Sequence, residues 1–181
     1  MSQDKSQWIR ASLDRYEGQL TRYAYRITLD LEKAREVVQE TFLKLWQADR
    51  AQVEGHLAEW LYTVCRNQAL DLRRKDSRMV PLAKDGAIDT PDETPSAGEQ
   101  LEQRQEENRV LDAFAALTGK QQEVLRLKFQ GGLSYAEISR VTGLSVSNIG
   151  YIIHTGIQRI RQQLGSTLSP EMAVEGASSH D

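Results

Sequence analysis

The side chains best suited to recognise another molecule lie on one face of a segment with helical periodicity at 145–164. Apolar residues recur there at intervals of three or four, as Ile149, Ile153, Ile157, Ile160 and Leu164. If this stripe packs inward, the other face presents hydrogen-bonding groups. They belong to Ser147, Asn148, Tyr151, His154 and Thr155. Such groups can bond to base edges in the major groove of DNA, so the face is a candidate for reading DNA.

A shorter predicted helix at 134–141 precedes this segment. Ser134 and Glu137 have the spacing of a capping box, in which each side chain bonds to the backbone N–H of the other residue. Gly143 can adopt the positive φ of a tight turn, and Ser145 can cap the second helix. The pattern predicts a helix-turn-helix whose second helix, starting at Ser145, enters the major groove. An ordinary pair of packed helices has the same spacing, so simple packing stays open as an alternative.

A second group of candidate residues lies in a predicted helix at 56–76. Aromatic, amide and cationic side chains share this helix, as Trp60, Tyr62, Arg66, Asn67, Arg73, Arg74 and Lys75. Single-stranded nucleic acid requires this combination, because bases stack on rings and phosphates pair with cations. Alternatively, the rings belong to the core and the cations only complement the dipole at a helix C-terminus. These residues alone do not decide between the two interpretations.

Carboxylates spaced by four occupy the polar side of a predicted helix at 32–48, where Glu32, Glu36 and Glu40 are followed by Lys44. No histidine accompanies them at Glu-x-x-His spacing, so we expect a solvated or partner-facing surface and no metal site. The chain's three histidines are scattered, and no nucleophile-base pair accompanies them. We therefore expect a protein that is not an enzyme and holds no cofactor.

Helical periodicity recurs along the chain, and sustained alternation typical of strands is absent. The sequence predicts an all-α fold with helices at 5–28, 32–48, 56–76, 99–116, 119–130, 134–141 and 145–164. Three of the four prolines and several carboxylates fall within 79–98, which is typical of a linker. We expect small helical domains at 1–78 and 99–164, an acidic linker at 79–98 and a disordered tail at 165–181.

The formal net charge of −3 conceals an uneven distribution. Residues 1–80 hold 14 Lys and Arg against 12 Asp and Glu, and residues 109–164 hold 7 against 3. Residues 81–108 hold 2 against 8, and residues 165–181 hold none against 3. Two basic blocks are thus separated by an acidic one, which keeps nucleic-acid binding possible despite an acidic pI.

Cysteine usage and the N-terminal sequence bear on the compartment. Cys65 is the single cysteine, so no internal disulfide can form and a reducing compartment is expected. Charged residues interrupt the first twenty positions, which argues against a secretory signal, and no apolar run is long enough to span a membrane. We expect a cytoplasmic protein.

Three motifs in order resemble bacterial RNA polymerase sigma factors of the extracytoplasmic-function type. They are the segments Val38–Trp46, Trp60–Asp71 and Leu133–Ile138, and the similarity extends over about residues 10–164. The resemblance implies a σ2 domain, a linker and a σ4 domain, and no catalytic residues. It also implies three partners: core RNA polymerase, promoter DNA and an anti-sigma factor or other regulator.

The resemblance assigns roles to residues at matching positions. Core polymerase would bind the face of Glu36, Gln39, Glu40 and Lys44. The minus-ten element would be melted and held by Trp60, Tyr62, Arg66, Asn67, Arg73, Arg74 and Lys75. The minus-thirty-five element would be read by Ser145, Ser147, Asn148, Tyr151, His154 and Thr155.

The chain departs from the family in the predicted recognition helix. The family usually has basic residues at positions that Gly150, Ile152 and Thr155 occupy here. Gly150 and Gly156 also each cost about 1 kcal/mol of helix propensity relative to Ala, so a compensating role is expected. Two other functions remain as alternatives: a stand-alone helix-turn-helix regulator, and an interaction module that binds a regulatory protein in place of DNA.

Overall fold

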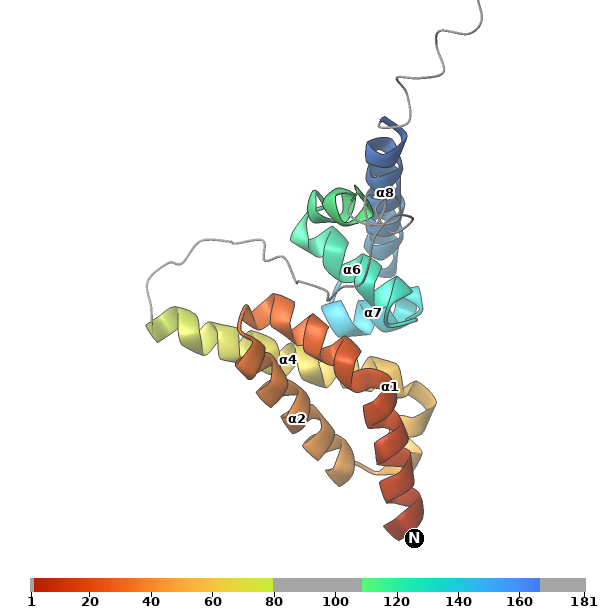
Figure 1. The fold of residues 1–181 in the computed structure, drawn as a ribbon. Coiled ribbons are helices and arrows are strands. Elements are labelled where there is room, and N and C mark those ends of the chain that lie inside the picture. Colours follow the sequence, from red (N-terminus) through yellow and green to blue (C-terminus); the bar gives the residue numbers. More distant parts are fainter. Residues whose placement is uncertain (1, 80–108, 167–181) are drawn as a thin grey trace, which may run out of the picture. The chain divides into compact units, whose positions relative to one another are not determined.

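A computed structural model describes residues 2–79 and 109–166 of the chain (Figure 1). Every regular element in these two ranges is a helix, which confirms the all-α prediction. Residues 109–115 form part of the helix predicted at 99–116. The rest of that prediction, nearly all of the linker and most of the tail lie outside the described residues.

Internal contacts divide the chain into two units, Met1–Ile88 with Leu127–Val146, and Asp89–Arg126 with Ser147–Asp181. This division differs from the domains expected from sequence, which keep 99–164 together. The sequence-based boundaries therefore stay a prediction, and each unit is described on its own.

The first unit is built on three long helices, α1 (Ser2–Thr28), α2 (Leu31–Gln47) and α4 (Leu57–Met79). Each contributes fully buried side chains to a shared core, among them Leu20, Leu45 and Leu61. The three helices match those predicted from periodicity. Two short elements, α3 (Arg50–Val53) and η1 (Glu54–His56), were not predicted, because three or four residues are too few to show a helical period.

Helix α7 (Tyr135–Thr142) also belongs to the first unit, and its ends confirm the predicted signals. The hydroxyl of Ser134 accepts the N–H of Glu137, whose carboxylate accepts the N–H of Ser134. These bonds hold the pKa of the Glu137 carboxyl below its ordinary value. Gly143 ends the helix with φ 76°, a conformation that glycine adopts without steric cost. Near this end Arg140 donates two hydrogen bonds, of 2.6 and 2.7 Å, to the buried carboxylate of Glu59 on α4.

The second unit contains helix α8 (Val146–Ser166) and most of α6 (Gly119–Phe129). Thr118 and Gln121 form the predicted capping pair, since the N–H of each is bonded to the side-chain oxygen of the other. Gly156 of α8 is buried, and a Cβ atom at this position would lie 3.0 Å from the Leu125 side chain of α6. Gly156 therefore compensates its low helix propensity by allowing close helix packing.

Candidate nucleic-acid interface

Helix α4 carries most of the residues predicted to contact single-stranded DNA. Asn67, Arg73, Arg74 and Lys75 are exposed, whereas Trp60 and Arg66 are half-buried. One side of α4 carries Trp60, Asn67 and Arg74, because successive members of this set are seven residues apart, which is close to two helical turns. This side presents a ring, an amide and a cation in succession, the chemistry needed to hold bases and phosphates.

Tyr62 does not belong to this exposed side. Its exposed fraction is 2%, its ring meets the Tyr23 ring edge to face at 5.2 Å, and its hydroxyl donates to Gln19 Oε1 at 3.3 Å. Burial raises the pKa of Tyr62 to about 12. The predicted contact of Tyr62 with DNA therefore loses its support, and the residue is part of the core. The signal was present in the sequence, because Tyr62 borders the buried stripe of Leu61, Cys65 and Ala69.

Most of the residues predicted on the recognition helix are exposed in α8 and just before it. Ser145, Ser147, Asn148, Tyr151 and His154 are all exposed, and Tyr151 has an exposed fraction of 67%. Thr155 differs. Its hydroxyl lies 2.9 Å from the carbonyl oxygen of Tyr151 and accepts a hydrogen bond from Gln121 Nε2 at 3.4 Å. The hydroxyl of Thr155 is thus engaged with the protein itself.

The structure explains one departure from the family, Ile152. The resemblance implies a basic residue at this position, but Ile152 has an exposed fraction of 8% and joins Ile149 and Ile153 in the core. The reason is helical geometry: positions 149, 152, 153 and 156 share one face at 100° per residue. A basic side chain at 152 would be buried. Gly150 is half-buried and remains a departure without a structural account.

The residues predicted to bind core polymerase border two grooves beside α2. Glu36, Glu40 and Lys44 line a groove of about 380 Å³ between α2 and α4, together with Gln68, Asp71 and Lys75. Gln39 instead lines a larger groove, of about 820 Å³, between α1 and α2. All four residues are exposed, and around the helix Glu36 lies between Gln39 and Glu40, so the four share one exposed face of α2 that borders both grooves.

Two residues of the larger groove were not singled out from sequence. Leu43 and Trp46 line it and have exposed fractions of 57% and 47%, which is high for side chains of this size. Both lie off the buried stripe that contains Val38, Phe42 and Leu45. Apolar residues outside the stripe of an amphipathic helix were the available signal. Exposed apolar side chains at a groove are typical of a protein-protein contact.

The described part of the chain holds no metal-ligand cluster and no exposed thiol. No group of three metal-ligating side chains is found there. Cys65 is buried, and burial raises the pKa of its thiol to about 12. No helix in residues 2–79 or 109–166 is long and apolar enough to span a membrane.

Comparisons with known proteins identify the family. The model of sigma-70 region 2 matches residues 13–79, and that of sigma-70 region 4 matches residues 107–160. The ECF RNA polymerase sigma factor SigL of Mycobacterium tuberculosis is 33% identical over 171 residues, which cover 88% of this chain and 92% of SigL. RpoE of Cereibacter sphaeroides, another ECF sigma factor, is 30% identical over 134 residues, covering 73% of this chain and 72% of RpoE.

A solved structure has the same fold. The sigma factor RpoE of Bartonella quintana, crystallised with the anti-sigma factor NepR, aligns with a TM-score of 0.61 at 21% identity. The alignment covers 86% of this chain and 96% of RpoE. The sequence comparisons place the chain in a class of transcription initiation factors. The chain belongs to the ECF RNA polymerase sigma factors of the sigma-70 family.

Proposed function

We propose that this chain binds core RNA polymerase, directs it to promoters with a minus-ten and a minus-thirty-five element, and helps to open the DNA. The observation that carries the proposal is the exposed side of α4, where Asn67 and Arg74 continue the line of half-buried Trp60. A base stacked on an aromatic ring is stabilised by about 1–3 kcal/mol, which offsets part of the cost of unstacking the duplex. Arg73 and Lys75 supply cations for the backbone of the captured strand.

The exposed start of α8 is proposed to read the minus-thirty-five element in the major groove. An asparagine can bond to an adenine through two hydrogen bonds, and Asn148 is exposed in the first turn of α8. Tyr151 lies one turn further on the exposed face and can contact the methyl group of a thymine. No Lys or Arg occurs from Val146 to Gln158, so this contact depends on hydrogen bonds and shape more than on phosphate attraction.

Core polymerase is proposed to bind the exposed face of α2. Leu43 and Trp46 provide apolar area in the larger groove, which Gln39 also lines. Glu36 and Glu40, which line the smaller groove, provide charge. Apolar contacts in such an interface supply most of the affinity, whereas charged residues at its rim govern orientation and association rate.

Three further parts of the proposal follow from family membership. The chain contributes no catalytic residues, because polymerase performs the chemistry. It works in the cytoplasm with the polymerase. A regulatory protein of the anti-sigma class restrains it, and the support for this part is the anti-sigma factor crystallised with the B. quintana sigma factor.

Transcription of a genomic DNA library with purified core polymerase tests the proposal. Transcript 5′ ends are sequenced with and without the chain. We expect a set of new start sites that share two upstream elements and that appear only when the chain is present. A chain that binds duplex DNA tightly and specifically by itself, and adds no start sites, would instead be a stand-alone regulator. A chain that competes for core polymerase but adds no start sites would favour the interaction module.

A further inference from the structure

The basic end of α4 has little tertiary support of its own. From Asp71 to Asp76 only Leu72 and Asp76 are half-buried, and the other four side chains are exposed. Exposed side chains contribute little apolar packing, so contacts at this end are few. The continuous helix sets the direction of this end, and within 71–76 Leu72 and Asp76 are the less exposed side chains that can reinforce it.

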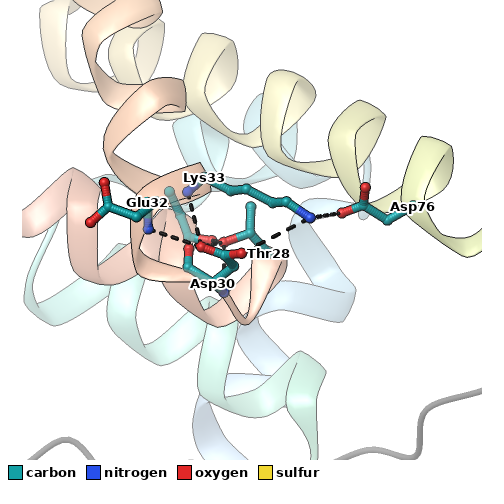
Figure 2. A network of polar contacts seen from close by, with 6 residues as sticks. Thr28, Asp30, Glu32, Lys33 and Asp76 are labelled. Atoms are coloured by element: carbon teal, nitrogen blue, oxygen red, sulfur yellow. Dashed lines mark hydrogen bonds and ion pairs between the residues drawn. The ribbon is translucent and has the colours of Figure 1, made fainter.

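Asp76 is held by Lys33, which reaches across from α2 (Figure 2). Lys33 Nζ lies 2.6 Å from Asp76 Oδ2, and the two residues are 43 positions apart in the chain. The hydrogen bond to Asp76 raises the pKa of Lys33 above its ordinary value. The same ammonium is 4.0 Å from Asp30 Oδ2, so it bridges a carboxylate at the start of α2 and one at the end of α4.

The backbone that carries Lys33 is itself fixed. Leu29 adopts a left-handed conformation with φ 57°, and Asp30 then caps α2 by accepting the N–H groups of Glu32 and Lys33 at 2.9 and 3.2 Å. The hydroxyl of Thr28 accepts the N–H of Asp30 at 3.4 Å (Figure 2). A left-handed non-glycine residue persists only where the surroundings hold it, so this turn offers a rigid base for Lys33.

The ion pair also changes the local charge. Residues 71–76 contain three cations, Arg73, Arg74 and Lys75, and two carboxylates, Asp71 and Asp76. The carboxylate of Asp76 would repel a phosphate near these cations. Lys33 offsets that charge, while Arg74 lies 3.4 Å from Asp71.

We infer that Lys33 is a positioning residue for minus-ten DNA: its ion pair with Asp76 aims the basic end of α4 at the DNA backbone. This inference rests on the proposed function of α4. The ion pair could act by positioning the helix end or by neutralising the charge of Asp76. The two roles can be separated, because Asp76→Asn removes the positioning contact and also makes the surface more positive by one charge.

The sign of the effect of Asp76→Asn is therefore the test. The probe is a pre-melted promoter whose sequence comes from the start sites that the transcription experiment identifies. Holoenzyme is titrated onto this probe, and binding is followed by fluorescence anisotropy. If charge alone mattered, Asp76→Asn would tighten binding. We expect it to weaken binding by about two- to fivefold, the range for loss of an exposed ion pair. Binding that is unchanged or tighter overturns the inference.

Exchange of the two charges tests the pairing itself. Lys33→Asp should weaken binding, the double variant Lys33→Asp with Asp76→Lys should restore it, and Lys33→Arg should remain near the original protein. A double variant that stays as weak as Lys33→Asp overturns the pairing. Thermal melting and competition for core polymerase, measured on each variant, should not change in parallel with DNA binding.

Asp4→Asn is a matched control at the other end of the three-helix unit. Asp4 pairs with Arg50 at 2.6 Å. Arg50 follows the C-terminus of α2, and that C-terminus is about 20 Å from Lys33 along the helix axis. This variant adds the same charge and breaks a similar pair, and it should not weaken binding. Lys75→Ala tests the proposed function: if it has no effect on the probe, α4 does not bind DNA there. If Lys75→Ala weakens binding and Asp76→Asn does not, only the inference about Lys33 fails.

Discussion

Asn67 and Tyr62 lie five residues apart on α4 and have opposite environments. The amide of Asn67 is exposed, whereas the ring of Tyr62 is buried against Tyr23 of α1. Resemblance to a family assigns both to DNA, because a matching motif carries no information on which way each side chain points. The environment of each residue separates a role in DNA capture from a role in packing.

Asn67→Ala should reduce promoter opening more than polymerase binding. Loss of a hydrogen bond to an unpaired base should lower the yield of open complex by about two- to tenfold, since such a bond contributes about 0.5–1.5 kcal/mol. Permanganate reactivity of unpaired thymines measures opening, on duplex and on pre-melted templates. Gln52→Ala is the control, because it also removes an exposed amide, from α3. Equal reactivity of the Asn67 variant and the original holoenzyme on duplex DNA would contradict the assignment.

Tyr62→Leu should leave promoter opening intact and lower stability. Leucine preserves an apolar side chain in the core but removes the ring that a base would need, along with the bond to Gln19. We expect a loss of about 1–3 kcal/mol in the free energy of unfolding, measured by urea denaturation. Opening is measured well below the unfolding temperature. A stable variant that fails to open DNA would return Tyr62 to the DNA-contacting side.

At the scale of elements, α2 presents one exposed face whose two borders line different grooves. Gln39 lies in the groove shared with α1, and Glu40 lies in the groove shared with α4. Both residues are nevertheless exposed, and Glu36 and Leu43 lie between them around the helix, so one exposed face of α2 includes both. In the proposed interface with core polymerase, the exposed Leu43 and Trp46 make the first of these grooves the larger source of binding energy.

Leu43→Ser and Glu40→Lys should therefore weaken core-polymerase binding to different extents. Leu43→Ser removes exposed apolar area and should raise the equilibrium dissociation constant about tenfold, since truncation of a buried interface anchor costs more than 1 kcal/mol. Glu40→Lys should act more through association rate and lose its effect at high salt. Competition with the original chain for core polymerase, over a range of salt concentrations, distinguishes the two. Neither change should alter folding by more than about 0.5 kcal/mol, because both positions are exposed.

Helical elements were predictable from this sequence, but several side-chain directions were not. The capping pairs at Ser134 and Thr118 and the glycine at 143 fix helix ends by local chemistry, so their positions follow from sequence alone. The direction of Ile152 depends on the phase of a long helix with apolar residues on more than one side. The contact of Lys33 with Asp76 joins residues 43 positions apart, and no local pattern indicates it.

At the scale of the whole molecule, charge is separated along the chain. Residues 1–80 and 109–164, which contain α4 and α8, carry net charges of +2 and +4, whereas residues 81–108 and 165–181 carry −6 and −3. The basic blocks are modest, and the exposed start of α8 holds neither Lys nor Arg. Non-specific attraction to DNA, which depends on phosphate neutralisation, should be weak for a chain with this distribution.

The isolated chain should therefore bind duplex promoter DNA poorly and acquire specificity only with core polymerase. Anisotropy titrations with a promoter duplex and a scrambled duplex, repeated over a salt series, measure both quantities. Alone, the chain should prefer the promoter by less than about tenfold, far below the 10³ or more of specific complexes. Holoenzyme should prefer the promoter over the scrambled duplex by about 10³ or more. Each phosphate contacted adds about 0.9 to the magnitude of the salt slope, so the slope of the isolated chain counts the contacts it makes unaided. A steep slope with strong promoter preference in the absence of polymerase would show that the chain recognises its site alone, and the stand-alone regulator would then be the better description.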